Sequence, residues 1–216
     1  MTRRAACFAR AVVVACSLPA VAGAQTAPIQ LPTPDRTGGR PLMQALQDRR
    51  SQREFRREPL PMPMLSNLLW AAFGINRSDG RRTAPSASNR QEIDVYVAMP
   101  GGLYLYDARA HRLQPIVPGD LRAATGTQAF AGDAAIDLVY VADFGKVSGA
   151  SADDRLLYAG ADAGVIAENV YLFCASERLA TVVRASVDRT ALARRIGLRT
   201  DQRIILAQSV GYPASH

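Results

Sequence analysis

Side chains that commonly build catalytic sites are scarce in this sequence of 216 residues. It has two histidines, His111 and His216, and three cysteines. No histidine, cysteine and carboxylate residues cluster at metal-ligand spacing, so the sequence predicts no metal site. A nucleophile elbow, a P-loop and the glycine pattern of a Rossmann turn are missing as well. The sequence therefore predicts no catalytic residue of its own, and we expect a bound cofactor to carry the chemistry if the protein is an enzyme.

Lysine is also scarce. Lys146 is the sole lysine among 26 basic residues, and arginine supplies the others; with 19 acidic residues, the formal net charge is +7. Nucleic-acid-binding proteins more often carry a dense basic stripe interleaved with aromatic residues, whereas both signs of charge are scattered along this chain. We therefore expect no nucleic-acid partner.

Residues 1–24 have the pattern of a secretory signal peptide. Basic residues precede an apolar run from Ala11 to Val21, and Ala22-Gly23-Ala24 forms a small-residue cleavage site. The apolar run is too short to span a bilayer, so we expect no transmembrane segment in the mature chain. The signal contains three arginines and no acidic residue, so its removal lowers the formal charge from +7 to +4. The expected location is periplasmic or secreted.

Two alternatives concern this signal. A cut before Cys16 would make a lipoprotein, although little apolar sequence precedes that position. The pair Arg3-Arg4 could belong to a twin-arginine signal, which exports proteins already folded around a cofactor, or to an ordinary basic leader. We favour the ordinary signal peptide in both cases.

Cys174 is the single cysteine that remains after the signal is removed, so no internal disulfide can form. It lies in the apolar helical pattern "NVYLFCASERLA", and neither histidine is expected beside it. We predict a buried structural thiol.

Composition divides the mature chain into two parts. Residues 25–40 are rich in proline and glycine without apolar periodicity, which predicts a tether or an arm wrapped on a partner. Residues 41–213 have the length of one domain with a real core.

Apolar periodicity within this domain predicts an α+β fold. Helices and strands mix without strict βαβ alternation, so helices should flank a central sheet. The run 136–143 is continuously apolar, as in a central strand. Asp188 is a predicted helix N-cap. Helices are predicted at 41–50, 64–73, 120–125, 161–178 and 188–196, and strands at 93–99, 103–107, 112–117, 136–143, 179–185 and 203–212.

The stretch "RRSQREF", Arg49 to Phe55, places three arginines around one serine. Arginine presents a planar fork of donors that matches phosphate or carboxylate oxygens, and serine adds a small hydroxyl. The cluster could therefore hold a phosphorylated ligand. The alternative is a solvated helix C-terminus, where cations complement the helix dipole.

A second stretch, "TAPSASN" from Thr83 to Asn89, is a run of small residues around a proline. Small side chains let a planar ligand approach the backbone, and the Asn89 amide could offer a donor and an acceptor to a heterocycle edge. The alternative is an ordinary surface loop.

Taken in order, several stretches resemble the nitroreductase family of flavin enzymes over essentially all of the mature domain. The branch that is most similar includes the flavin dehydrogenases of azole-forming peptide pathways. The resemblance rests on "RRSQREF", "LSNLLWAAFGINR", "APSASNRQEIDVYV", "GLYLYD", "DAGVIAENVYLFCASERLATVVRA" and "VGYP".

The resemblance implies an α+β homodimer with a mixed, mostly antiparallel central sheet and two FMN molecules at the subunit interface. It implies an oxidoreductase that transfers hydride by a ping-pong mechanism from NAD(P)H or another donor to a small-molecule acceptor. Three groups of residues would bind FMN. The phosphate and pyrimidine edge would contact Arg49, Arg50, Ser51 and Arg53, the partner chain would supply Pro85, Ser86, Ala87 and Asn89, and the ring near N5 would border Arg184, Ala185 and Ser186.

This chain departs from the family pattern in two places. Ala185-Ser186 stands where relatives often carry Glu-Gly, and larger members have basic residues after the last strand that reach the phosphate. We therefore expect phosphate binding to rest on the N-terminal arginines, with Arg53 beside N1 and the C2 carbonyl of the flavin. Because NAD(P)H is scarce outside the cytoplasm, an exported member could use another donor. A redox-inactive protein that binds flavin or another planar ligand is the alternative function.

Overall fold

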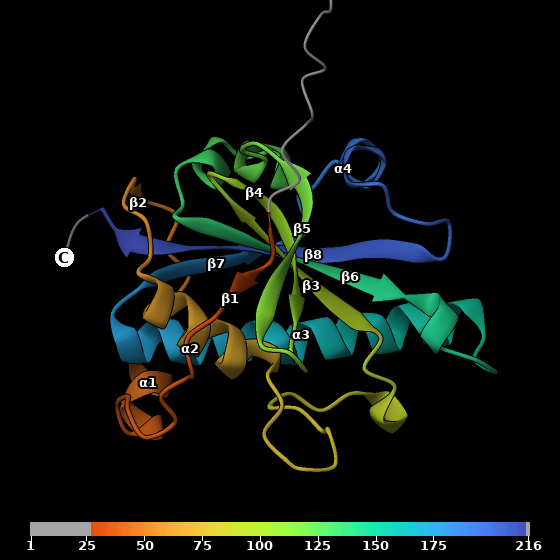
Figure 1. Ribbon diagram of the computed structural model, residues 1–216, viewed down its shortest axis with the longest axis horizontal. Coiled ribbons are helices and arrows are strands. Elements are labelled where there is room, and N and C mark those ends of the chain that lie inside the picture. Colours follow the sequence, from red (N-terminus) through yellow and green to blue (C-terminus); the bar gives the residue numbers. More distant parts are fainter. Residues whose placement is uncertain (1–26, 215–216) are drawn as a thin grey trace, which may run out of the picture.

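A single antiparallel sheet organises residues 27–214, the part of the chain that the computed structural model describes (Figure 1). The strand order is β1-β5-β4-β3-β6-β8-β2, and β7 also pairs with β8. Every pairing between these strands is antiparallel. The strands are β1 (Ile29–Gln30), β2 (Phe55–Arg56), β3 (Ile93–Met99), β4 (Gly102–Asp107), β5 (Arg112–Pro118), β6 (Ile136–Asp143), β7 (Ala180–Arg184) and β8 (Gln202–Pro213).

The apolar run of β6 occupies the middle of this sheet. All eight of its residues are buried, and it pairs with β3 on one side and β8 on the other. A strand that is covered on both faces reads as a continuous apolar run, so the predicted central strand is confirmed. The bounds of β3 and β6 also match the predicted ranges 93–99 and 136–143.

Helices cover both faces of the sheet, which confirms the predicted α+β class. In Figure 1, α1, α2 and α3 lie on one side and α4 on the other, with the short green 3-10 turns near α4. The α-helices are α1 (Leu42–Asp48), α2 (Met62–Phe73), α3 (Ala152–Glu177) and α4 (Arg189–Ile196), and the 3-10 helices are η1 (Ala87–Asn89), η2 (Arg122–Thr125), η3 (Ala129–Gly132) and η4 (Phe144–Lys146).

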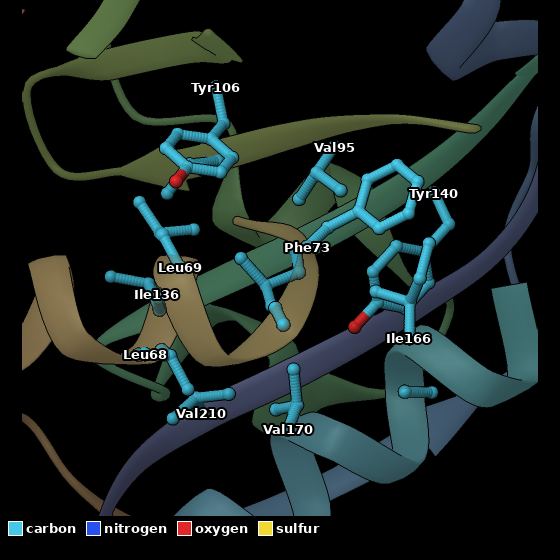
Figure 2. Packing of buried hydrophobic residues seen from close by; sticks show 14 of the residues in the cluster. Leu68, Leu69, Phe73, Val95, Tyr106, Ile136, Tyr140, Ile166, Val170 and Val210 are labelled. Carbon is cyan, nitrogen blue, oxygen red and sulfur yellow. The ribbon is translucent and has the colours of Figure 1, made fainter. Parts of the chain in front are cut away.

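The larger core lies between the sheet and the pair α2 and α3. One cluster of buried side chains contains Leu68 and Phe73 of α2, Tyr140 of β6, and Ile166 and Val170 of α3 (Figure 2). These five side chains are at most 1% exposed. Full burial of each side chain of this size stabilises the fold by about 1.5–3 kcal/mol. This packing fixes α3 against the sheet.

The long helix α3 begins at Ala152, earlier than the predicted start at Ala161. Ser151 caps it by accepting a hydrogen bond from the Asp154 N–H at 3.1 Å, and Asp153 and Asp154 occupy the first turn. Both features favour a helix N-terminus. Directly before α4, the Asp188 side chain accepts a hydrogen bond from the Ala191 N–H at 3.0 Å, which confirms the predicted N-cap.

The Pro/Gly-rich segment lies along the sheet of its own chain. Ile29 pairs with Leu113 of β5, and Leu31 is 3% exposed. Ser66 Oγ donates to the Pro32 carbonyl at 2.5 Å and lies 2.7 Å from His111 Nε2. Residues 29–32 are therefore part of the domain, where we had expected a tether or an arm on a partner.

The predicted signal peptide, residues 1–24, lies outside the described residues. Within residues 27–214, no helix has the length and apolar character needed to cross a membrane.

Candidate flavin site

The arginine-rich segment leaves α1 on extended backbone. Helix α1 ends at Asp48, and Arg49 follows it with φ −58° and ψ 123°. The Gln52 N–H donates to the Thr181 carbonyl at 2.9 Å, and the Ala214 N–H donates to the Glu54 carbonyl at 3.1 Å. The segment is thus attached to β7 and to the end of β8, and the helix ends at Asp48, two residues before the predicted end of the helix 41–50.

Three arginines of this segment are available to a ligand. Arg49 is half-buried, and Arg50 and Arg53 are exposed. None of the three forms an ion pair with a carboxylate among residues 27–214, whereas nearby Arg40 pairs with Asp48 at 2.6 Å. Unpaired guanidinium groups beside a serine hydroxyl are a donor set that fits a phosphate group.

Tyr171 connects this segment to β7. Its side chain is 6% exposed, and its phenol oxygen lies 2.7 Å from Ser51 Oγ. The same oxygen accepts a hydrogen bond from the Val183 N–H at 3.0 Å. The Arg49 guanidinium lies 5.3 Å from the centre of the Tyr171 ring, in cation–π range. The structure therefore brings the predicted cluster 49–53 close to the end of β7, directly before residues 184–186.

The Arg184 side chain is directed into the protein. It is 3% exposed and forms a buried ion pair with Asp137. It also donates to Ser209 Oγ at 3.0 Å and to the Thr125 carbonyl at 2.5 Å. A Cβ at Gly126 would collide with this guanidinium. These contacts occupy the side chain, which leaves the backbone of Arg184 and the exposed residues Ala185 and Ser186 to border a ligand.

The predicted segment 85–89 forms the 3-10 turn η1 and a left-handed loop. Pro85 and Asn89 are exposed, and Ser86 and Ala87 are half-buried. The Ala87 N–H donates to Asp162 Oδ2 at 3.0 Å, and Ser86 Oγ accepts from the Gln91 N–H at 2.9 Å.

Backbone conformation in this loop is costly. Ser88, Asn89 and Gln91 all have positive φ, between 49° and 53°. Such conformations cost a non-glycine residue roughly 1–2 kcal/mol each. The loop is therefore held in shape by its contacts with Gln91 and Asp162.

The two predicted clusters contact different parts of α3. The loop 85–89 contacts Asp162, whereas Ser51 contacts Tyr171, about 13 Å further along the helix axis. The structure therefore does not bring residues 85–89 to residues 49–53 within one chain.

A buried carboxyl pair lies under the loop. Glu92 is fully buried, and neither of its carboxyl oxygens has a hydrogen-bond partner among residues 27–214. Burial, and after it the neighbouring Asp162 carboxyl, raise the pKa of Glu92 to about 7. Sequence reasoning missed this pair, because a lone Glu between a loop and a strand gives no local sign of burial.

Cys174 is fully buried and unpaired, as predicted. Burial raises the pKa of its thiol well above the ordinary value, which makes it a poor nucleophile. No group of three histidine, cysteine, aspartate or glutamate side chains within residues 27–214 is placed to hold a metal ion.

Comparison with known proteins identifies the class. The family model described as "Nitroreductase family" matches residues 46–212, and the chain belongs to this family. Members of this family commonly bind flavin.

Particular relatives support the same assignment. A candidate nitroreductase of Methanocaldococcus jannaschii is 32% identical over 151 residues, which cover 65% of this chain and 76% of the relative. The crystal structure of a candidate nitroreductase from Ralstonia eutropha JMP134 is 49% identical and has a TM-score of 0.85. That similarity covers 90% of this chain and 93% of the other.

More distant structures share the fold. The Escherichia coli microcin synthetase McbBCD complex matches with 19% identity and a TM-score of 0.66, over 77% of this chain and 71% of that one. The NADPH:FMN oxidoreductase of Vibrio harveyi matches with 19% identity and a TM-score of 0.61, over 81% and 69%.

Proposed function

We propose that the chain is an exported, FMN-dependent oxidoreductase that works as a homodimer. One observation carries the proposal: three arginines that have no carboxylate partner within residues 27–214 surround Ser51, next to the end of β7, in a chain of the nitroreductase family. This donor set suits the phosphate and the polar edge of a flavin.

The residues of this chain would bind and position the cofactor. Arg49, Arg50 and Ser51 would hold its phosphate, and Arg53 would lie beside N1 and the C2 carbonyl. The loop Ala185-Ser186 would border the ring near N5. When bound, FMN would accept hydride from a donor substrate and pass it to an acceptor in a second, separate step. A fixed positive charge at Arg53 would favour the reduced cofactor, because reduction adds negative charge at that edge.

A homodimer would complete this site. Residues 85–89, which the family resemblance assigns to the flavin ring, lie far along α3 from residues 49–53, so they would reach the cofactor of the partner chain. Apolar side chains are also exposed on α1 and α3: Leu42 is 62% exposed, Met43 is 73% exposed and Leu157 is 67% exposed. A second copy of the chain would cover such a surface.

Spectroscopy of the purified mature chain would test the proposal. A flavin absorption spectrum that bleaches under anaerobic addition of NADPH or another donor would support an oxidoreductase. Flavin that binds but resists every donor would favour the alternative, a redox-inactive protein that binds a planar ligand. Light scattering would test the dimer, and a flavin-loaded monomer would contradict the shared site.

Export rests on the sequence pattern of residues 1–24 alone. Cell fractionation and N-terminal sequencing of the mature chain would test it. We expect a new N-terminus at Gln25 and a protein outside the cytoplasm.

A further inference from the structure

A cavity of about 280 Å³ lies between the end of α3, the start of β7 and the arginine segment. Its walls include Arg50 and Gln52 of the segment, Tyr171 and Arg178 at the end of α3, and Thr181 of β7. Whole small-molecule ligands usually occupy pockets of about 300–1,000 Å³. The volume therefore suits one end of a ligand better than an entire flavin.

The charge of this cavity favours an anion. Arg40, which also lines it, is paired with Asp48 at 2.6 Å, so these two charges balance each other. Arg50 and Arg178 are exposed and form no ion pair with a carboxylate in the described part of the chain. The C-terminal end of α3 contributes the equivalent of about half a negative charge. Two unpaired guanidinium groups outweigh it.

Arg178 reaches this position through an unusual backbone conformation. It caps α3 in the left-handed region, with φ 59° and ψ 34°, and its N–H donates to the Cys174 carbonyl. Glycine is the usual residue at such a helix end, because a side chain there costs roughly 1–2 kcal/mol. The structure thus places a long cationic side chain at a cavity wall where a glycine would be the less strained residue.

We propose that Arg178 is a further binding residue for the phosphate group of FMN, which it would contact in this cavity beside Arg50, already assigned to the phosphate above. The inference rests on the proposed function. Tyr171 ties the cavity to the rest of the candidate site, because its side chain both lines the cavity and contacts Ser51. Arginine forks can each give two hydrogen bonds to phosphate oxygens, so a pair of them would hold a dianion in one orientation. Free phosphate has the same chemistry, and the experiment separates the two sources.

The test compares FMN with riboflavin, which has the same ring system and no phosphate. Wild type, Arg178→Ala, Arg178→Lys and the control Arg194→Ala are titrated with both ligands by fluorescence. Arg194 is exposed on α4, on the other face of the sheet (Figure 1). We expect Arg178→Ala to weaken FMN binding about tenfold or more, as the loss of a charge-assisted hydrogen bond predicts. Riboflavin binding should stay within about twofold of wild type, Arg178→Lys should recover part of the loss, and Arg194→Ala should match wild type.

Inorganic phosphate provides the second arm. Inorganic phosphate should compete with FMN for binding to the wild-type protein, and it should no longer compete for binding to Arg178→Ala. If wild type binds FMN and Arg178→Ala binds it equally well, the inference is wrong while the proposed function stands. Equal losses for FMN and riboflavin would also overturn it, because Arg178 would then act on the fold or the ring. If FMN and riboflavin bind wild type equally while phosphate binds, the cavity is a site for free phosphate. If neither flavin binds wild type, the proposed function fails and the inference fails with it.

Discussion

Ser51 Oγ lies 2.7 Å from the phenol oxygen of Tyr171, which in turn accepts a hydrogen bond from the Val183 N–H at 3.0 Å. Because that N–H occupies one lone pair of the phenol oxygen, the phenol can give its own proton to Ser51. One buried side chain of α3 therefore holds both the arginine segment and the end of β7. The candidate site depends on this side chain for its shape.

Tyr171→Phe should lower the stability of the protein and its FMN affinity without abolishing FMN binding. The ring that contacts Arg49 stays, but Val183 N–H and Ser51 Oγ lose their common partner. An unpaired buried donor costs about 1–3 kcal/mol, so the free energy of unfolding should fall by that amount. FMN affinity should fall several-fold as well. Urea denaturation and fluorescence titration measure the two effects.

The matched control is Tyr158→Phe, because the Tyr158 phenol lies on the same helix, is half-buried and makes no hydrogen bond among the described residues. It should behave as wild type. Wild-type stability in Tyr171→Phe would show that the contact is incidental.

Arg49 and Arg53 should differ in what they do to the cofactor. Arg49→Ala removes a hydrogen-bond donor to the phosphate and should weaken FMN binding about tenfold or more, with little change in midpoint potential.

Arg53→Gln keeps a hydrogen-bond donor near the flavin ring but removes the positive charge, so it should lower the midpoint potential and slow reduction of the flavin. Fluorescence titration and a redox titration of each variant measure these effects.

Unchanged affinity in Arg49→Ala together with an unchanged potential in Arg53→Gln would mean that the segment is only a solvated stretch of arginines. The flavin assignment would then lose its main physical support. The two variants should also differ from each other. If each of them lowered both the FMN affinity and the midpoint potential, the substitutions would be acting through a general loss of site structure.

Local pattern was enough to predict some elements and not others. The bounds of β3 and β6, the N-cap at Asp188 and the burial of Cys174 follow from apolar runs and cap chemistry within a few residues. The strands β1 and β2 have two residues each, which is too short for any periodicity to show. The helix start at Ala152 was missed because the first turn of α3 is polar and the apolar Leu156 and Leu157 that follow it are exposed, so the buried apolar pattern begins only later in the helix.

The site itself was predictable only as separate segments. Arginine and serine in one stretch, and small residues in another, indicate ligand chemistry by type. The contact between Ser51 and Tyr171 joins residues 120 positions apart, and no local pattern predicts it. The same holds for the Arg184 side chain, which the sequence could not distinguish from a ligand-facing arginine.

Glu92 should make stability fall as pH rises. Its pKa is raised to about 7 in the folded protein from an ordinary value of 4.5, so the folded state holds the proton more tightly than the unfolded chain. The stability contributed by the bound proton is complete below the unfolded pKa and is lost as pH rises from about 4.5 to about 7. Glu92→Gln keeps the shape and stays neutral, so we expect a flatter profile and a gain of about 1–3 kcal/mol at pH 8.

Denaturant unfolding between pH 5 and pH 8 measures this prediction. Burial also raises the pKa of Asp137, so the wild-type slope alone is ambiguous, and the difference between Glu92→Gln and wild type isolates Glu92. Glu168→Gln, at an exposed position of α3, serves as the control and should keep the wild-type profile. Parallel profiles for Glu92→Gln and wild type would show that Glu92 is charged in the folded protein and has a partner.

The buried pair of Arg184 and Asp137 should support the site through the loops that it joins. Arg184 donates to the Thr125 carbonyl, and two residues later the Thr127 N–H donates to the Ser186 carbonyl at 3.0 Å. Burial raises the pKa of Asp137, and the Arg184 guanidinium opposes that rise. Arg184→Met leaves the carboxyl buried without its partner and should lower the free energy of unfolding by about 3–5 kcal/mol. FMN affinity should fall with it, because the loop Ala185-Ser186 loses its anchor.

A double variant separates charge from packing. Arg184→Met combined with Asp137→Leu removes both charges, and apolar replacements of a buried ion pair are often neutral or stabilising, so most of the lost stability should return. FMN affinity should recover less, since the hydrogen bond to Thr125 is still missing. Arg199→Met is the control: the Arg199 side chain is 57% exposed, so water screens its pairs with Asp201 and with the less exposed Asp143, and ion pairs at the surface contribute about 0–1 kcal/mol. If Arg184→Met is no less stable than Arg199→Met, the pair does not hold this part of the fold, and the link from Arg184 to the loop at Ser186 is wrong.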